Sequence, residues 1–259
     1  MGRAIYVSSV NGDDANSGYA PEKAFRSLRK VNQMEIQPGD QILLERGSVF
    51  VGEYLHLYRG GTKEAPVVVD AYGEGALPRI ETDGNGIWYQ NYGGHLDNVV
   101  HIWKGYLSSA VLLYDAEYIS IRNLEITNNP CVKNERLNQA DRMNRTGVSV
   151  IAKNHGTLHE IELDHLYIHD VEGNIYDKHL NNGGIYMSVS RPDDEEKTGI
   201  ARYDGIHIHH CKVENCRRWG IAAGYTYQHD KFTTLELPDE VVKTYGSTNV
   251  VIEHNFVKD

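Results

Sequence analysis

The sequence predicts an all-β fold made of stacked coils, and the first reason is an internal repeat. The stretch EIELDHLYIHD has three further copies in the 259-residue chain. The copies follow one another at steps of 42, 45 and 44 residues and occupy Tyr118–Asn128, Glu160–Asp170, Gly205–Asn215 and Asn249–Asp259. A fixed period of this length is typical of solenoids, in which each repeat contacts only its neighbours.

Alternation within each copy is the second reason. In the copy at Glu160–Asp170, the apolar pair Ile161 and Leu163 is followed by a second pair, Leu166 and Ile168. Apolar residues two apart are typical of a strand with one buried face. The break between the two pairs predicts a corner, so each copy contains two short strands rather than one long strand.

A second set of strands lies between the copies and is the third reason. It begins at Gly147, Gly184 and Gly220, at steps of 37 and 36 residues. Two strand clusters in each period of about 40 residues suggest two coils of roughly 20 residues each. Because strands this short cannot bury a face alone, each coil must stack on the next in parallel register. We therefore predict a parallel β-helix, a solenoid formed by a single chain.

The N-terminal region, residues 1–40, is expected to form a cap of this same domain. Ala4–Ser9 alternates as a short strand, and Asn11–Gly18 is a cluster of Asn, Asp and Gly typical of turns. Pro21–Met34 carries apolar residues at helical spacing, with Pro21 near the first helical position. The sequence therefore predicts a strand followed by an amphipathic capping helix.

Residues 41–259 are expected to form the coils. Asn128–Thr146 is a long polar segment between two coils, and such insertions often build the binding surface of a solenoid. The last copy, Asn249–Asp259, stops in the middle of a coil. Because an open sheet edge promotes aggregation, we expect no C-terminal cap within this sequence, and further coils or a partner covering that end.

Composition narrows the classes of partner. The net charge of −10 argues against nucleic acid, and no apolar run is long enough to span a membrane. Cys131, Cys211 and Cys216 form no metal-like or disulfide-like spacing, and Cys211 falls in an inward column. The first residues, MGRAIYVSS, do not have the apolar h-region of a signal peptide. We expect an extracellular or periplasmic protein whose signal is absent from this sequence, with a cytoplasmic location left open.

Three N-terminal stretches carry a resemblance to a known group of proteins. They are AIYVSSVNGDDANSG from Ala4, APEKAFRSLRKVN from Ala20 and QPGDQILLERGSVF from Gln37. They resemble the cap and first coils of bacterial right-handed parallel β-helix proteins that act on carbohydrates, a group with polysaccharide lyases and some glycoside hydrolases. The resemblance implies a right-handed coil, which the bias of parallel crossovers also favours, and a glycan substrate. The matching turn residues imply no catalytic role.

The second set of strands predicts a binding groove. Its outward positions beside Tyr186 are small, namely Ser149, Ser188, Ala222 and Gly224, which leaves room for a ligand against the sheet. Charged and aromatic residues flank these strands. They are Arg145, Asp177, Lys178, His179, Arg191, Arg218, Trp219, Tyr225 and Tyr227.

Two chemistries suit such a groove. In β-elimination on a uronate-containing polysaccharide, Lys178, His179 or Arg218 would act as the base. Arg145, Arg191 and the aromatic residues Tyr186, Trp219, Tyr225 and Tyr227 would bind the substrate, and Asp177 would hold a Ca²⁺ ion that neutralises the uronate. We expect this lyase reaction first, because the groove is richer in cations than in paired acids.

Two alternatives stay open. A glycoside hydrolase would need two facing carboxyl groups, drawn from Asp177, Asp193, Asp194 and Asp204. A non-catalytic carbohydrate-binding or structural solenoid would need only the aromatic residues, to which Trp88, Tyr89 and Tyr92 could add sugar contacts.

The run HIHH raises a separate hypothesis about metal binding. His207 and His209 share one face of a strand, but they lack a third ligand unless Asp164 or Glu253 supplies it. Outward columns of this kind are usually solvated ladders of cross-strand pairs, and the sequence favours that structural interpretation.

Overall fold

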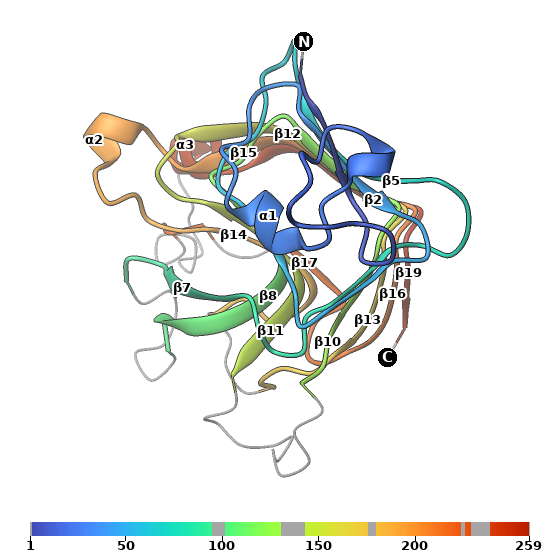
Figure 1. Ribbon diagram of the computed structural model, residues 1–259. Coiled ribbons are helices and arrows are strands. Elements are labelled where there is room, and N and C mark those ends of the chain that lie inside the picture. The colour runs from blue at the N-terminus through green and yellow to red at the C-terminus, as the bar shows by residue number, and fades with distance from the viewer. Residues whose placement is uncertain are drawn as a thin grey trace.

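The computed structural model describes residues 2–94, 102–130, 143–175, 180–223, 226–228 and 239–258. Figure 1 looks along the solenoid, whose strands form three sides around a central core. All three sides are parallel sheets stacked in register, so the predicted all-β fold and parallel β-helix are confirmed. None of the described helices is long and apolar enough to cross a membrane.

Each sheet collects one strand from every coil. Sheet A has seven strands among the described residues, in the order β1 (Ala4–Val7), β2 (Gln41–Glu45), β5 (Val67–Tyr72), β9 (Ile119–Arg122), β12 (Thr157–Asp164), β15 (Arg202–His209) and β18 (Thr248–Glu253). Sheet B has six, in the order β3 (Val49–Val51), β6 (Arg79–Glu81), β10 (Glu125–Asn128), β13 (Tyr167–Val171), β16 (Lys212–Cys216) and β19 (Phe256–Lys258).

Sheet C forms the third side and carries an extra layer. Its parallel strands are β4 (Leu55–Leu57), β8 (Lys104–Tyr114), β11 (Asn144–Ala152), β14 (Gly183–Val189) and β17 (Ile221–Ala223). Strand β7 (Ile87–Asn91) pairs antiparallel with the first part of β8, and the rest of β8 pairs parallel with β4 and β11.

One coil contains three strands and occupies the whole repeat of 42 to 45 residues. The chain runs through β12 in sheet A, β13 in sheet B and β14 in sheet C before it enters the next coil at β15. The prediction of two coils of about 20 residues in each period is therefore wrong. The strands that begin at the glycines do not stack on the repeat copies, because they form the third side of the same coil.

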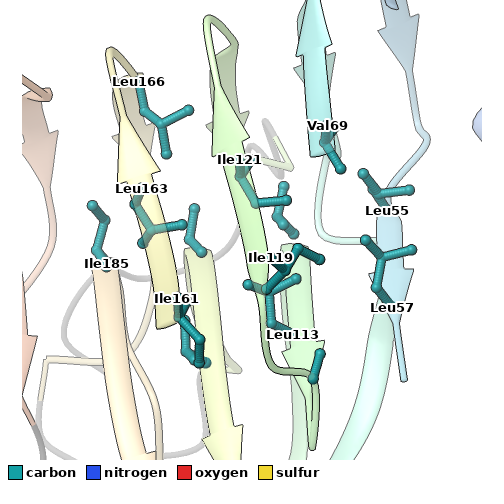
Figure 2. Close-up of a cluster of buried hydrophobic side chains, with 14 of the residues drawn as sticks. Leu55, Leu57, Val69, Leu113, Ile119, Ile121, Ile161, Leu163, Leu166 and Ile185 are labelled. Atoms are coloured by element: carbon teal, nitrogen blue, oxygen red, sulfur yellow. The ribbon is translucent and has the colours of Figure 1, made fainter. Parts of the chain in front are cut away.

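The inward columns follow the predicted register. Ile161 pairs with Ile119 on one side and with Ile206 on the other, and all three side chains are almost fully buried. Figure 2 shows Ile119, Ile161 and neighbouring aliphatic side chains pointing into one continuous core. Cys211 is 1% exposed and belongs to this core, as its place in the repeat predicted.

The corner between sheets A and B is built from residues in the left-handed region. Asn123, His165, His210 and His254 occupy equivalent places in four coils, with φ between 50° and 57°. The rings of His165, His210 and His254 stack in sequence, with centroids 4.9 and 5.3 Å apart. Asparagine is among the residues that tolerate this conformation best, which explains the polar residue that interrupts each repeat.

The predicted capping helix at Pro21–Met34 forms only in two short pieces. They are the 3₁₀-helix Pro21–Lys23 and α1 (Leu28–Asn32). Between them, Phe25 exchanges backbone hydrogen bonds with Tyr6 and Ser8 beside β1, at 2.9 and 2.8 Å. This extended pairing buries Phe25 in the core and interrupts the helix, a tertiary contact that helical spacing cannot reveal.

Helix α1 lies over the near end of the coils in Figure 1, and its buried residues Leu28 and Val31 join the core. Glu53 Oε2 accepts a hydrogen bond of 2.6 Å from the Leu28 amide at the start of the helix. Two further helices, α2 (Glu195–Thr198) and α3 (Asp239–Tyr245), lie on the connections from sheet C to sheet A.

Candidate functional site

The corner between sheets B and C holds the connections of two successive coils. The chain leaves sheet B at the end of β10 and of β13, and enters sheet C at β11 and β14. Buried polar side chains gather here in place of the apolar residues that fill the coils, namely Asn128, Asn144, Arg145, Glu172, Asn174, Asn181 and Asn182. Because buried polar groups need partners, this corner is a built polar site rather than a loose surface.

Arginines from the two flanking coils converge on the start of the connection that follows β13. Arg145 is 6% exposed, and its guanidinium donates a hydrogen bond of 2.8 Å to the carbonyl of Glu172. Arg217 Nε lies 3.2 Å from both carboxylate oxygens of Glu172. Arg218 donates to the carbonyl of Ile175. These side chains hold the backbone between residues 172 and 175 in place.

Trp219 completes this corner on the solvent side. Its ring is 42% exposed, and the guanidinium carbon of Arg218 lies 5.4 Å from the ring centroid. A shallow cavity of about 330 Å³ opens beside it, lined by Arg217 and Arg218 among other residues. An exposed indole beside a cation is suited to stacking on the apolar face of a sugar ring.

Sequence reasoning missed Asp83, which lies at the same corner. The turn that contains it is bonded to sheet B through the Gly84 amide, which donates to Asn128 Oδ1 over 2.9 Å. Burial and the neighbouring charge of Glu81 raise the pKa of Asp83. The repeat could have identified it, because Asp83 follows strand β6 in sheet B much as Glu172 follows strand β13.

At β11 and β14, the outer face of sheet C is not an open groove. Ser149, Tyr186 and Ser188 are at most 3% exposed, so the expectation that small residues leave room for a ligand there is wrong. Strand β7 packs over this face, and its Gln90 Nε2 donates to Asn181 Oδ1 over 2.9 Å. The outward positions are small because a second protein layer covers them.

That layer has its own apolar cluster and its own polar network. Trp88 packs with Leu107, Leu112, Ile151 and Leu180. The network joins the indole nitrogen of Trp88 to the hydroxyls of three residues, Ser109, Thr146 and Ser149.

Of the three aromatic residues expected to contact sugar, two are buried. Trp88 and Tyr92 are 7% and 1% exposed and belong to the covering layer. Tyr89 alone of the three is exposed, at 46%, and its ring lies 5.1 Å from that of Tyr106 on β8.

The structure divides the predicted groove residues between two ends of sheet C. Arg145, Arg218 and Trp219 lie at the corner with sheet B, where the strands begin. Arg191 and Tyr227 lie at the opposite end, where the strands lead to sheet A. Tyr186 lies beneath the covering layer and does not reach the surface.

At the sheet A end, Tyr227 is buried and its hydroxyl donates to Glu195 Oε2 over 2.8 Å. Burial, followed by this hydrogen bond and the negative charge of Glu195, raises the pKa of Tyr227. Arg191 is exposed, and its backbone amide donates to the carbonyl of Tyr92 over 2.9 Å. Asp177, Lys178, His179, Gly224 and Tyr225 lie outside the described residues.

The acids proposed for hydrolysis have structural partners. Asp193 accepts hydrogen bonds from Lys153 Nζ at 2.7 Å and from Asn154 at 2.8 Å, which lower its pKa. Asp194 Oδ1 accepts from the Lys197 amide over 3.2 Å and caps α2. Asp204 likewise accepts from two residues of the next coil, Thr248 and Asn249.

A second polar cavity, of about 480 Å³, lies at the corner between sheets C and A. It is lined by Asp115, Glu117 and His155 among other residues. Burial raises the pKa of Asp115, although its carboxylate accepts backbone hydrogen bonds from Lys153 and Asn154, the shorter 2.6 Å long. Sequence reasoning missed this pair of acids, which directly follows β8.

Comparison with known proteins gives a consistent result. No family model matches the chain. The chain is 39% identical to the lacto-N-biosidase of Bifidobacterium longum subsp. longum over 99% of its own length, which is 18% of that protein. It is 55% identical to the crystal structures of the GH136 lacto-N-biosidase from Eubacterium ramulus, with TM-scores of 0.96 and 0.95. The chain covers 41% of that protein.

These findings overturn the prediction of a polysaccharide lyase. The proteins that the chain resembles are named as lacto-N-biosidases, and GH136 is a family of glycoside hydrolases. The hydrolase alternative is therefore better supported than β-elimination. The lyase prediction depended on a cation-rich groove, and the guanidinium groups of Arg145 and Arg218 are instead bonded to backbone carbonyls.

Proposed function

We propose that this chain is the β-helix part of a glycoside hydrolase that releases lacto-N-biose from an oligosaccharide. The observation that carries the proposal is the 55% identity and TM-score of 0.96 to the Eubacterium ramulus enzyme across 99% of this chain. The chain spans less than half of that protein's length, so the proposal concerns the activity of the whole protein to which it belongs.

Glycoside hydrolysis requires two carboxyl groups beside the scissile bond, about 5–5.5 Å apart for retention and about 6.5–9.5 Å apart for inversion. We assign the chain a substrate-positioning role at the corner between sheets B and C. The support is the arginine cluster around Glu172, in which Arg145 is buried and which contacts residues 172 and 175, and the exposed ring of Trp219 beside it.

The proposal is tested by incubating the full-length protein with p-nitrophenyl lacto-N-bioside and with a uronate polysaccharide. We expect release of p-nitrophenol and of lacto-N-biose, with no ultraviolet absorbance from unsaturated uronate. Failure to cleave the lacto-N-bioside, with cleavage of an unrelated glycoside, would assign the protein to another hydrolase specificity. Binding of the sugar without any cleavage would instead favour a non-catalytic solenoid.

The same assay locates the substrate-facing corner. Arg218→Ala removes the guanidinium that holds the Ile175 carbonyl, and we expect kcat/KM to fall about tenfold or more because a substrate-positioning loop shifts. Arg46→Ala is the matched control, since Arg46 also donates to a backbone carbonyl, that of Gly75, at a different corner. Equal losses in both variants would show that the effect is one of stability and not of position.

A further inference from the structure

The outward face of sheet A carries a cluster of metal-ligating side chains away from the corner between sheets B and C. Glu162 on β12 and His207 and His209 on β15 each offer a ligand atom, and the three atoms all lie within 4.8 Å of one another. The strands are paired in register, with Glu162 beside His207, so the backbone already brings the three side chains together. The sequence prediction looked for the third ligand in Asp164 or Glu253 and overlooked Glu162.

The geometry of the cluster suits a small ion. His209 Nε2 lies 3.2 Å from Glu162 Oε1. Two ligands of a tetrahedral zinc ion, each at about 2.0–2.1 Å, are separated by about 3.3 Å. The rings of His207 and His209 stack with centroids 3.9 Å apart and planes 26° apart, so both imidazoles extend from the sheet side by side.

Neighbouring groups orient the histidine ligands. His209 Nδ1 lies 3.1 Å from Asp164 Oδ1 and 2.8 Å from His210 Nδ1. Asp164 can accept a proton from Nδ1, so an ion that replaces the hydrogen bond between Nε2 and Glu162 Oε1 would bind the Nε2 lone pair. Metal-binding histidines are commonly oriented by a carboxylate in this way.

The carboxylate of Glu162 is oriented as well. The hydroxyl of Ser120, on the preceding coil, donates to Glu162 Oε2 over 2.6 Å and leaves Oε1 for the cluster. Glu253, on the following coil, lies 3.1 Å from His207 Nε2. Four successive strands of sheet A thus contribute to one site, and all of its ligands stand on regular strands rather than on loops.

We propose that Glu162, His207 and His209 bind a divalent transition-metal ion, with Zn²⁺ as the best match. Two imidazoles and one carboxylate are a ligand set typical of zinc, whereas calcium requires six or more oxygen ligands. The three protein ligands leave one coordination position for water or another ligand. Because the ion would join β12 to β15, binding it would also stabilise adjacent coils against separation.

A second group of ligand atoms lies close by and must be distinguished. Asp164, His165 and His210 also lie within 4.8 Å of one another, at the corner between sheets A and B. Two of its three residues are exposed, whereas all three residues of the first group are partly buried, and the His209 side chain is 13% exposed. The less exposed group on the regular strands is the better organised site.

The test begins with full-length protein from which metal has been removed with a chelator. This protein is titrated with Zn²⁺, and isothermal titration calorimetry measures the affinity. We expect His207→Asn to weaken one binding event about tenfold or more, because it removes one of three ligands. His165→Asn, the matched control in the neighbouring group, should leave the same event unchanged within about twofold. Unchanged affinity in His207→Asn, or the loss of binding in His165→Asn instead, would overturn the assignment.

Electron paramagnetic resonance of bound Cu²⁺ gives a readout that does not depend on stability. The spectrum of the unsubstituted protein should show coupling of Cu²⁺ to two imidazole nitrogens. The spectrum of His207→Asn should show coupling to only one. Circular dichroism of both variants in chelator checks that each is folded. A spectrum identical to that of the unsubstituted protein in a folded His207→Asn variant would contradict the proposal.

Discussion

His56 is a buried histidine whose environment in the solenoid disfavours the protonated, charged form. The side chain lies on β4 with 6% exposure, and its Nε2 donates to the carbonyl of Ser109 over 2.9 Å. Burial, only partly offset by this hydrogen bond, lowers the pKa of His56 from 6.5 to about 4. The native protein therefore keeps this histidine neutral at a pH where the unfolded chain begins to bind a proton.

The first prediction follows from that difference. Between pH 6.5 and about 4, the unfolded state binds more protons at His56 than the native state does. The contribution of His56 to the free energy of unfolding is therefore complete above pH 6.5 and is lost as the pH falls. The loss amounts to about 3 kcal/mol at most. His56→Gln keeps a donor for Ser109 but cannot titrate, so its free energy of unfolding should vary less with pH. Urea unfolding at several values from pH 7.5 to 4.5 measures the difference, and parallel pH profiles would refute it.

The arginines of the candidate site also have partners that the sequence did not predict. Arg145 and Arg218 lie at the same corner, as their spacing predicted, yet their guanidinium groups are bonded to the carbonyls of Glu172 and Ile175. The position of an arginine in the repeat predicts where its backbone lies. It does not predict which group its side chain will bind. That partner comes from a connection of different length in another coil.

At the scale of elements, β7 decides which face of sheet C is available. Its Gln90 and Asn181 exchange two hydrogen bonds, of 2.9 Å from the Gln90 side chain and of 2.8 Å from the Asn181 amide. Asn181 also donates to Ser149 Oγ over 3.3 Å, which ties the layer to the sheet beneath. The layer therefore depends on polar contacts as well as on its small apolar cluster.

We predict that Gln90→Ala loosens this layer. The change leaves the buried backbone amide of Asn181 without the Gln90 oxygen that accepts its hydrogen bond, at a cost of about 1–3 kcal/mol. Amide hydrogen exchange in β7 should become about tenfold faster or more, while exchange in sheet A stays unchanged. Ile87→Thr is the control, because Ile87 lies on the same strand but is 55% exposed. Equal exchange rates in the two variants would show that the polar contacts do not hold the layer.

At the scale of the whole molecule, a column of glycines sets how closely the sheets approach one another. A Cβ atom at Gly147 would lie 2.5 Å from Ile168 Cγ2, and one at Gly184 would lie 2.5 Å from Val213 Cγ1. Each contact joins a sheet C strand to the sheet B strand of the following coil, β11 to β13 and β14 to β16. Gly184 does not have a positive φ, so it is required for space and not for backbone conformation.

Gly184→Ala should therefore destabilise the solenoid. The added methyl group meets Val213 and, at 2.6 Å, the backbone oxygen of Gly220, and such overpacking costs about 1–3 kcal/mol. Gly94→Ala is the matched control, because no atom of the described residues lies within 4 Å of a Cβ atom there. The urea midpoints of the two variants measure the effect. Equal midpoints would mean that the corner can relax to admit the methyl group.

The sequence by itself determined the architecture and the inward columns. Alternating residues such as Ile161 and Leu163 face the core because neighbouring side chains on a strand point to opposite sides, and a fixed period aligns them from coil to coil. Only the tertiary structure decided that three strands make one coil, that β7 covers Tyr186, and that Phe25 pairs with β1 and divides the predicted helix. These outcomes depend on contacts between residues far apart in the chain, whose energies exceed the local preferences that a sequence pattern records.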